Sequence, residues 1–321
     1  MKLATLPDGS RDGRLHVVSR DLTRAAPAEA ATTMLKALER WDEIVSGLAA
    51  QYDTVNAGAG EPFDAMAAMA PLPRAWQWMD ASAYMSHSKL MDAAFGFEEK
   101  KHPDFPLMYQ GMSNQFYGSA ADMPMTSEDD GIDFEAEFGV ITSEVPFGAT
   151  PEVAAKCIRL VVQINDWSLR RLAPVEMKTG FGWIRAKPAC AMAPVAVTPD
   201  ELGSNWRDCR VDMTLNVFRN GERFGAASGY EMNYGFHELV AHTAYSRILP
   251  AGTVIGGGTV SNANFREVGS SCIAERRGIE MIDHGEARTH FMRFGESVKM
   301  EVFGADGAPV FGTLNQKVVK A

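Results

Sequence analysis

The 321-residue chain has only four cysteines, and they form no recognisable pattern. They are scattered, with no C-x-x-C pair, at Cys157, Cys190, Cys209 and Cys272. This arrangement argues against a zinc site or a disulfide framework and favours reduced thiols. The chain also lacks any apolar run near the roughly 18 residues that span a bilayer. Its first residues contain no apolar core of the kind that secretory signals carry. We therefore expect a cytoplasmic protein that does not bind membranes.

Positive charge is scarce, with 31 Lys and Arg against 41 Asp and Glu and a formal net charge of −10. A negative surface argues against nucleic acid or an anionic membrane as a partner. It would also repel an anionic substrate. A substrate that carries carboxylates therefore requires Arg, Lys or a metal ion inside its site.

Several catalytic and nucleotide-binding signatures are missing. The run Gly256-Gly257-Gly258-Thr259 lacks the Gly-Lys-Ser/Thr ending of a P-loop and the G-x-G-x-x-G spacing of a dinucleotide fold. There is no G-x-S-x-G nucleophile elbow, which counts against a serine hydrolase. A cysteine nucleophile is disfavoured because Cys272 has no matching histidine pattern. The glycine run is better suited to bringing backbone and the Thr259 hydroxyl close to a ligand.

Residues 1–70 are predicted to form a small N-terminal α/β domain. Strands are expected over 2–6 and 15–19, on either side of a turn-rich PDGSRDG segment. A helix should follow, because apolar residues recur on one helical face at Met34, Leu38, Trp41, Val45 and Leu48. Two prolines in the segment 70–78 indicate an extended entry into a second unit, so we place the boundary near residue 70.

The second domain, residues 71–321, is predicted to be mostly β. Thr150 followed by Pro151 is typical of a helix start, and residues 158–164 indicate a buried strand. Asn220-Gly221 is a strong hairpin signal. Many short strands, few helices and no repeated βα units imply an α+β fold, mostly β, with a rolled or barrel-like core.

The segment DFEAEF at 133–138 is the most informative stretch. In a strand, Glu135 and Glu137 point to one face while Phe134 and Phe138 point to the other. Two carboxylates about 7 Å apart on one face repel each other unless a positive group lies between them. A solvated edge strand is the simpler interpretation of an isolated Glu-x-Glu, but a hard divalent cation would also explain it.

Two further acidic residues follow apolar or aromatic runs. Asp80 comes after WQWM, and Asp166 comes after VVQIN. An aspartate in this position is often only a turn former. Carboxylates at strand ends can also hold an oxygen-ligated metal on a rigid scaffold, and four of them would keep the site anionic and bind the cation tightly.

Five blocks of residues, in this order, resemble the fumarylacetoacetate hydrolase family. They are Asp80-x6-His87, Asp133-Phe134-Glu135-x-Glu137, Asn165-Asp166-Trp167-Ser168-x-Arg170, Lys187 and Gly258-Thr259-Val260-Ser261. The resemblance extends from about residue 70 to the C-terminus. The N-terminal unit and the closing FGTLNQKVVK look like the bacterial fumarylacetoacetases of homogentisate and tyrosine breakdown. The resemblance implies the family's β-roll catalytic domain behind a small N-terminal domain.

The resemblance also implies a set of site residues. The metal ligands fall on Asp80, Glu135, Glu137 and Asp166. The general base falls on His87, and the glutamate that orients it on Glu275. Substrate and developing charge would be held by Arg170, Lys187, Thr259 and Tyr109. The other histidines lack such a pattern: His237 and His242 have the wrong spacing for a shared metal, and no partner pattern accompanies His16, His102, His284 and His290.

Two departures from the family pattern affect the grip on the distal carboxylate of the substrate. Ala173 stands where the animal enzyme has a glutamine after the Asn-Asp-Trp-Ser block. Pro188-Ala189-Cys190-Ala191 stands where the family often has a Gly-Thr pair after the lysine. Both changes leave the metal-binding residues intact.

The implied reaction is hydrolysis of a carbon–carbon bond in a β-diketo acid, with fumarylacetoacetate giving fumarate and acetoacetate. Such cleavage expels a carbanion, which a cation that chelates the dicarbonyl would stabilise. His87 suits the base because an ordinary histidine titrates near physiological pH, and general-base help of this kind is worth about 10²–10⁴-fold. Arg170 and Lys187 are the cationic donors for the oxyanion.

Other functions remain open. The same scaffold would serve a hydrolase of fumarylpyruvate or maleylpyruvate, or a decarboxylase or isomerase of 2-oxo acids. A non-catalytic protein that binds a cation or small molecule is a third possibility. The resemblance implies a homodimer, and the carboxylate set accepts Mg²⁺, Ca²⁺ or Mn²⁺.

Overall fold

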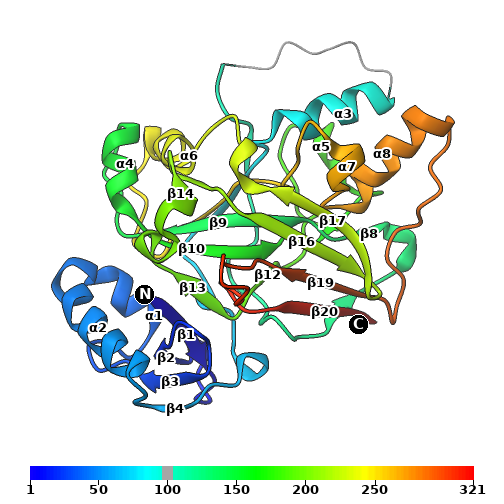
Figure 1. The fold of residues 1–321 in the computed structure, drawn as a ribbon. Helices are drawn as coiled ribbons and strands as arrows, with labels where there is room; N and C mark the ends of the chain where they lie inside the picture. The colour runs from blue at the N-terminus through cyan, green and yellow to red at the C-terminus, as the bar shows by residue number, and fades with distance from the viewer. Residues whose placement is uncertain (96–103) are drawn as a thin grey trace.

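The computed structural model describes residues 1–95 and 104–321, and most of their regular structure is β-strand. Two sheets share one hydrophobic core (Figure 1). The strands of the larger, eleven-stranded sheet are, in spatial order, β4 (Glu61–Pro62), β3 (Arg24–Pro27), β2 (Arg14–Val18), β1 (Lys2–Leu6), β13 (Val195–Val197), β10 (Ile158–Asn165), β9 (Ala136–Thr142), β18 (Val254–Gly256), β5 (Trp78–Ala81) and β6 (Met108–Gln110), with β12 (Ala191–Met192) paired to β10.

The second large sheet has five strands and packs against one face of the first. In order, they are β17 (Glu222–Ser228), β16 (Thr214–Arg219), β19 (Ser297–Glu301), β20 (Leu314–Lys320) and β7 (Met123–Met125). Two small pairs complete the strands, β11 (Ser168–Leu169) with β8 (Ile132–Asp133) and β14 (Trp206–Arg207) with β15 (Arg210–Val211). The mixed α+β, mostly β fold is confirmed. Within the described residues the larger sheet is open, with β4 and β6 at its edges, so the core is not a closed barrel.

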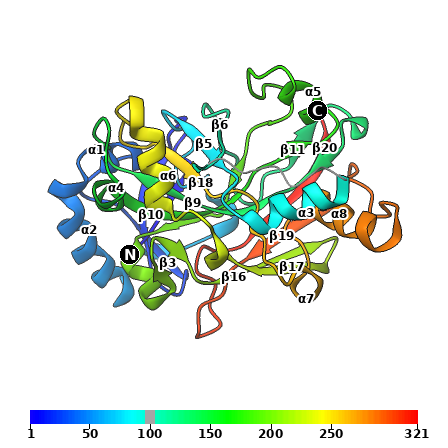
Figure 2. The ribbon, with the colours of Figure 1, turned by 90° about the horizontal axis from the view of Figure 1, so that it is seen from above.

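Helices lie around these sheets (Figure 1). They are α1 (Met34–Glu39), α2 (Trp41–Asn56), α3 (Met85–Phe95), α4 (Pro151–Cys157), α5 (Ala173–Met177), α6 (Phe236–Thr243), α7 (Phe265–Val268) and α8 (Ile273–His284). Helices α3 and α8 lie side by side in both views (Figures 1 and 2). In the part of the chain that the structure covers, no helix is both long and apolar enough to traverse a bilayer.

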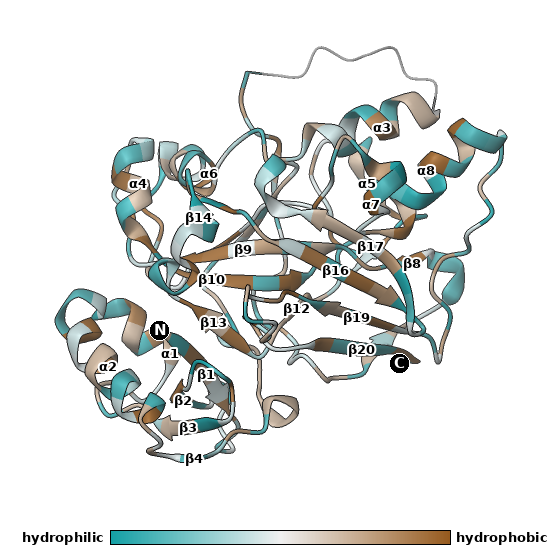
Figure 3. Ribbon diagram, in the orientation of Figure 1, coloured by the Kyte–Doolittle hydropathy of each residue, from teal (hydrophilic) through white to brown (hydrophobic). Residues whose placement is uncertain are grey.

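The central strands β9 and β10 are buried on both faces, and they are among the most hydrophobic elements of the chain (Figure 3). Side chains alternate along a strand, so Val161 enters the core shared with the five-stranded sheet while Leu160 and Val162 enter a second core. Glu137 and Gln163 are polar exceptions in these strands, and both are fully buried. A buried carboxylate in such a place requires a charged partner.

The N-terminal strands extend the larger sheet, because β1 pairs with β13 and Leu3 lies opposite Ala196. The second core joins Leu3 and Leu48 of this region with Ile164 of β10. The hairpin predicted over residues 2–19 is confirmed. The domain boundary near residue 70 stays a prediction, since sheet and core both continue across it.

The predicted helix start and hairpin turn were confirmed, whereas the predicted N-terminal helix differs in the structure. The predicted N-terminal helix is two helices, because Arg40 adopts non-helical φ and ψ of −122° and 24°. The apolar stripe survives the break, since Leu38 and Trp41 on either side are both buried. Periodicity therefore could not reveal it. Thr150 caps α4 as predicted, and Asn220-Gly221 forms the β16–β17 turn with positive φ at both residues.

Candidate metal centre and active site

Three carboxylates from separate strands meet at one end of the larger sheet. Asp80 lies in β5, Glu137 in β9, and Asp166 directly follows β10. Each offers an oxygen within 4.8 Å of the other two, and all three residues are at most 3% exposed. The strand order β10–β9–β18–β5 makes this possible, because it leaves only one strand, β18, between Glu137 and Asp80.

Strand β18 makes room for Asp80 with glycine. A Cβ on Gly256 would lie 2.3 Å from Asp80 Oδ1, so this position has no space for a side chain. Gly258, at φ +84°, donates its backbone N–H to the same oxygen at 3.1 Å. The sequence GGGT therefore fixes an aspartate through close backbone approach.

Two of the three carboxylates, Asp80 and Glu137, have no positively charged partner within ion-pair distance among the described residues, whereas Asp166 has Lys187. Both oxygens of Glu137 are buried without a hydrogen-bond partner among the described residues. Burial, followed by repulsion from Asp166, raises the pKa of Asp80 well above its ordinary value. Burial, followed by repulsion from Asp80, does the same to the pKa of Glu137. Buried, unpartnered acid oxygens of this kind fit a hard divalent cation, which prefers oxygen ligands.

Glu135 lies in a different environment, although it is only two residues from Glu137. The predicted strand is interrupted there, since β8 ends at Asp133 and Glu135 forms an isolated bridge with Cys272. Lys187 Nζ lies 2.6 Å from Glu135 Oε1 and Arg170 Nη2 lies 3.3 Å away. Its carboxylate also accepts hydrogen bonds from two hydroxyls, those of Ser168 and Thr259.

This environment keeps Glu135 ionised. Burial acts to raise its pKa, but Arg170 and Lys187 together hold the pKa below the usual range of a glutamate. Glu135 does not belong to the group of three carboxylates that could share an ion. Its assignment as a fourth metal ligand stays a prediction.

Lys187 and Tyr109 both hold Asp166. Lys187 Nζ lies 2.5 Å and the Tyr109 hydroxyl 2.6 Å from Asp166 Oδ2, while the Cys190 thiol donates to Oδ1 at 2.9 Å. Burial lowers the pKa of Lys187, but Asp166 and Glu135 outweigh it and raise the pKa above the ordinary value. The ammonium is therefore a fixed positive charge at the edge of the cluster.

Asp133 connects this cluster to helix α8. Its two carboxylate oxygens accept the backbone N–H groups of Ile273 at 2.7 Å and Ala274 at 2.9 Å, in the first turn of α8. Arg170 Nε donates to Asp133 Oδ2 at 2.8 Å. A carboxylate at a helix N-terminus is favourable because of the unpaired N–H groups there. Asp133 therefore aligns α8 with Arg170.

Helix α8 brings Glu275 toward His87 on α3. The distance from His87 Nδ1 to Glu275 Oε1 is 3.7 Å, and Nδ1 has no hydrogen-bond partner among the described residues. The Ser261 hydroxyl donates to the same Glu275 oxygen at 2.5 Å, and Ser86 donates to Ser261 at 3.0 Å. Glu275 is 1% exposed. The structure brings this predicted pair together, whereas His102 lies outside the described residues.

Sequence reasoning assigned no role to several residues that shape this site. Asp133, Ser168 and Ser261 stood within the motifs but carried no assignment, although each is buried and bonded to a predicted site residue. Trp183, which contacts Tyr109, gave no signal because it lies in an irregular segment.

Two protein-family models match the chain, one over its N-terminal residues and one over the rest. The model described as fumarylacetoacetate (FAA) hydrolase C-terminal matches residues 77–319. The chain belongs to the fumarylacetoacetate hydrolase family. A second model, fumarylacetoacetase N-terminal domain 2, matches residues 1–74. A search of curated proteins gave no match.

Solved structures of several enzymes share the fold. Maleylpyruvate hydrolase from Sphingobium sp. SYK-6, in complex with manganese(II) and pyruvate, has a TM-score of 0.66 at 12% identity, covering 100% of both chains. A 5-carboxymethyl-2-hydroxymuconate delta-isomerase from Mycobacterium smegmatis has 0.60 at 17%, covering 100% of this chain and 99% of its own. Fumarylpyruvate hydrolase from Pseudomonas aeruginosa, in complex with Mn²⁺ and pyruvate, has 0.55 at 13%, covering 82% and 94%.

The family model therefore gives the family of the chain, and the solved structures show that its fold is shared. Sequence identities below 20% are evidence for a shared fold but not for a shared substrate. A specific nearness to bacterial fumarylacetoacetases stays a prediction.

Proposed function

We propose that this family member is a metal-dependent hydrolase that cleaves a carbon–carbon bond of a β-diketo acid, with fumarylacetoacetate as the first candidate substrate. One observation carries the proposal: three buried carboxylates, two of them without an ion-pair partner among the described residues, lie beside the cations Lys187 and Arg170, in a fold that also pairs a histidine with a glutamate. Hydrolysis of a diketone needs charge stabilisation and a base, and this set of residues supplies both.

Asp80, Glu137 and Asp166 would hold the cation, with Glu135 as the fourth candidate. When bound, a divalent cation supplies Lewis-acid stabilisation of the negative charge that develops on the dicarbonyl oxygens. Arg170 and Lys187 hold positive charge beside Glu135 at the edge of this cluster, and the Thr259 hydroxyl there is a further donor. Each such donor, aimed where charge develops, is worth roughly 3–4 kcal/mol.

His87 would take the proton of the attacking water. Its Nδ1 faces Glu275, which leaves Nε2 for the water. Closing the 3.7 Å gap to Glu275 would orient the ring and stabilise the imidazolium that forms. Ser261 keeps the Glu275 carboxylate in place for this role. An electrostatic partner behind the imidazole favours hydrolysis, because water activation needs a base.

The test is turnover by the purified protein with Mn²⁺ or Mg²⁺. Fumarylacetoacetate, fumarylpyruvate and maleylpyruvate would be followed by loss of diketo absorbance, before and after exhaustive chelation. Hydrolysis of fumarylacetoacetate with the highest kcat/KM, abolished by chelation and restored by metal, supports the proposal. Full activity after chelation would contradict the metal-dependent mechanism.

A second candidate is hydrolysis of fumarylpyruvate or maleylpyruvate. It is favoured by the fold shared with hydrolases of those two substrates. The same substrate panel separates the two candidates. The acid hydrolysed with the highest kcat/KM shows whether the acyl group is fumaryl or maleyl and whether the other product is acetoacetate or pyruvate. An isomerase or decarboxylase of 2-oxo acids would change the substrate without releasing two hydrolytic products. The homodimer implied by the family resemblance stays a prediction.

A further inference from the structure

The segment between Arg170 and Lys187 carries one aromatic side chain onto the site. The rings of Trp183 and Tyr109 meet edge to face, with centroids 4.6 Å apart at 76°. Lys187 Nζ lies 5.7 Å from the Trp183 ring and 5.2 Å from the Tyr109 ring. Since Tyr109 and Lys187 both bond Asp166, Trp183 lies one contact away from the carboxylate cluster.

The Glu176 carboxylate holds the backbone that directly follows this aromatic residue. Glu176 accepts three successive backbone N–H groups, those of Ile184 at 3.0 Å, Arg185 at 3.0 Å and Ala186 at 3.1 Å. These groups join Trp183 directly to Lys187. The backbone N–H of Arg185 contributes most to lowering the pKa of Glu176, and hydrogen bonds to a charged acceptor are the stronger kind.

The stretch around Trp183 is not held by a helix or a strand of its own. In the described chain, residues 178–190 form neither helix nor strand, and main-chain hydrogen bonds hold the stretch at few points, such as the Leu169 N–H to the Ala186 carbonyl at 2.8 Å. The Trp183 Nε1–H adds one bond, to the Ala173 carbonyl at 3.3 Å. The other bulky apolar residues of the segment face solvent, with Phe181 97% and Ile184 83% exposed, whereas Trp183 is half-buried.

We propose that Trp183 is a specificity-determining wall for the acyl part of the substrate and that Glu176 is the positioning residue that holds it there. The inference rests on the proposed function in one respect, that the ligand is a diketo acid bound over the carboxylate cluster. An indole face beside a fixed ammonium suits a flat, conjugated carboxylic acid. Such a chain presents a π face to the ring, and a flexible saturated chain does not.

Fumarate and succinate test this wall, because they share charge and carbon number but only fumarate is flat and conjugated. Both would be titrated into the full-length, Mn²⁺-loaded protein by calorimetry. Stacking on one aromatic ring corresponds to about 2- to 12-fold in affinity. The wild type is expected to prefer fumarate by that factor or more. Trp183→Leu is expected to lose this part of the preference while keeping its Mn²⁺ affinity.

The matched control is Phe181→Leu, in the same segment but exposed to solvent, which should behave as the wild type does.

Glu176→Ala is expected to lose the preference and Glu176→Gln to keep part of it, since an amide oxygen still accepts backbone N–H groups. If Glu176 acts through Trp183, adding Glu176→Ala to Trp183→Leu changes nothing further. A merely structural glutamate would lower the preference in both backgrounds.

The proposal is overturned if the wild type binds the two acids equally or binds neither, or if Trp183→Leu keeps the full preference. Because binding is measured without turnover, its failure is separate from failure of the proposed function. A protein that hydrolyses no diketo acid but loses its fumarate preference with Trp183 would retain the wall and refute the hydrolase.

Discussion

Lys187 and Glu135 form an ion pair of 2.6 Å in which both side chains are 8% exposed. The same ammonium lies 2.5 Å from Asp166, so two carboxylates at the edge of the metal centre share one lysine. The acidic residues therefore differ: Glu135 has both Lys187 and Arg170 beside it, Asp166 shares Lys187, and neither Asp80 nor Glu137 has an ion-pair partner among the described residues.

This division leads to opposite expectations for catalysis and metal binding in Lys187→Met. Loss of a charge-stabilising donor should lower kcat by about 10²–10³-fold. Mn²⁺ affinity should hold or rise, because a positive charge beside the ion is removed. Stopped-assay kinetics and calorimetry measure the two effects, with the exposed Lys178→Met as control. An unchanged kcat would remove Lys187 from the reaction.

Metal uptake should release protons. Burial and mutual repulsion raise the pKa of Asp80 and Glu137, so the metal-free protein retains protons that a bound cation must displace. Affinity for Mn²⁺ is therefore expected to increase with pH. Calorimetry in two buffers of different ionisation enthalpy at one pH reports the protons released. Identical heats in both buffers would show that the carboxylates are already ionised.

If His87 is the general base, its loss should slow turnover without weakening Mn²⁺ binding. His87→Gln should lower kcat by about 10²–10⁴-fold and leave Mn²⁺ affinity within a factor of two or three. Glu275→Gln should have a smaller effect on kcat, since it removes the negative charge facing the imidazole but leaves the base in place. A His87→Gln enzyme with normal kcat would rule out this base.

The sequence could predict site residues that stand out in their own local segment, but not those whose surroundings come from distant parts of the chain. Asp80, Glu137 and Asp166 were identifiable because each ends or interrupts a strongly apolar run. Glu135 could not be distinguished from Glu137 by alternation, since its different environment depends on a strand break opposite Cys272 and on cations from residues 170 and 187.

The same limit applies to the fold. Strands such as β10 were predictable from apolar composition, whereas the break at Arg40 leaves the hydrophobic period unchanged. Trp183 was not predictable at all, because its position depends on three backbone groups captured by Glu176. Contacts between an irregular segment and a distant strand leave no periodic trace in the sequence.

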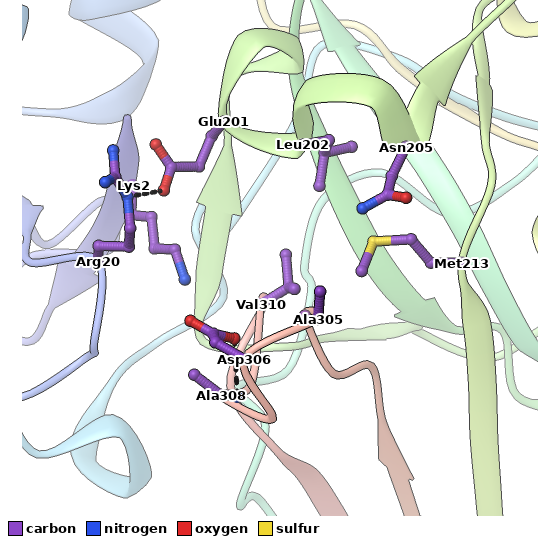
Figure 4. Close-up of a pocket in the computed structure, with 11 residues that line it drawn as sticks. Lys2, Arg20, Glu201, Leu202, Asn205, Met213, Ala305, Asp306, Ala308 and Val310 are labelled. Carbon is purple, nitrogen blue, oxygen red and sulfur yellow. Dashed lines mark hydrogen bonds and ion pairs between the residues drawn. The ribbon is translucent and has the colours of Figure 1, made fainter.

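Stability should respond to a buried lysine remote from the carboxylates. Lys2 lines a cavity of about 320 Å³ between β1 and residues 304–310 (Figure 4). It is 4% exposed, and its amine has one long hydrogen bond, 3.4 Å to the Pro309 carbonyl. Burial lowers the pKa of Lys2 from 10.5 to about 8, against the opposing effect of Glu201.

The sign follows from linkage. A lysine whose pKa is lower in the folded state costs stability below pH 8, and this cost disappears as pH rises toward 10.5. Lys2→Met should therefore raise the free energy of unfolding by roughly 1–3 kcal/mol at pH 7 and by much less near pH 10.5. Denaturant unfolding at both pH values measures this, with the exposed Lys36→Met as control. An equal effect at both values would show that packing, and not charge, is responsible.

The central claim is that Asp80, Glu137 and Asp166 share one divalent cation, and Mn²⁺ calorimetry on the wild type, Glu137→Gln and Glu135→Gln tests it most directly. We expect one Mn²⁺ per wild-type chain. Glu137→Gln should lose more than about 100-fold in affinity, beyond the 10–100-fold that loss of an outer partner costs, and Glu135→Gln should fall within that smaller range. A wild type that binds no Mn²⁺, or a Glu137→Gln variant that binds it as tightly as the wild type, would contradict the account.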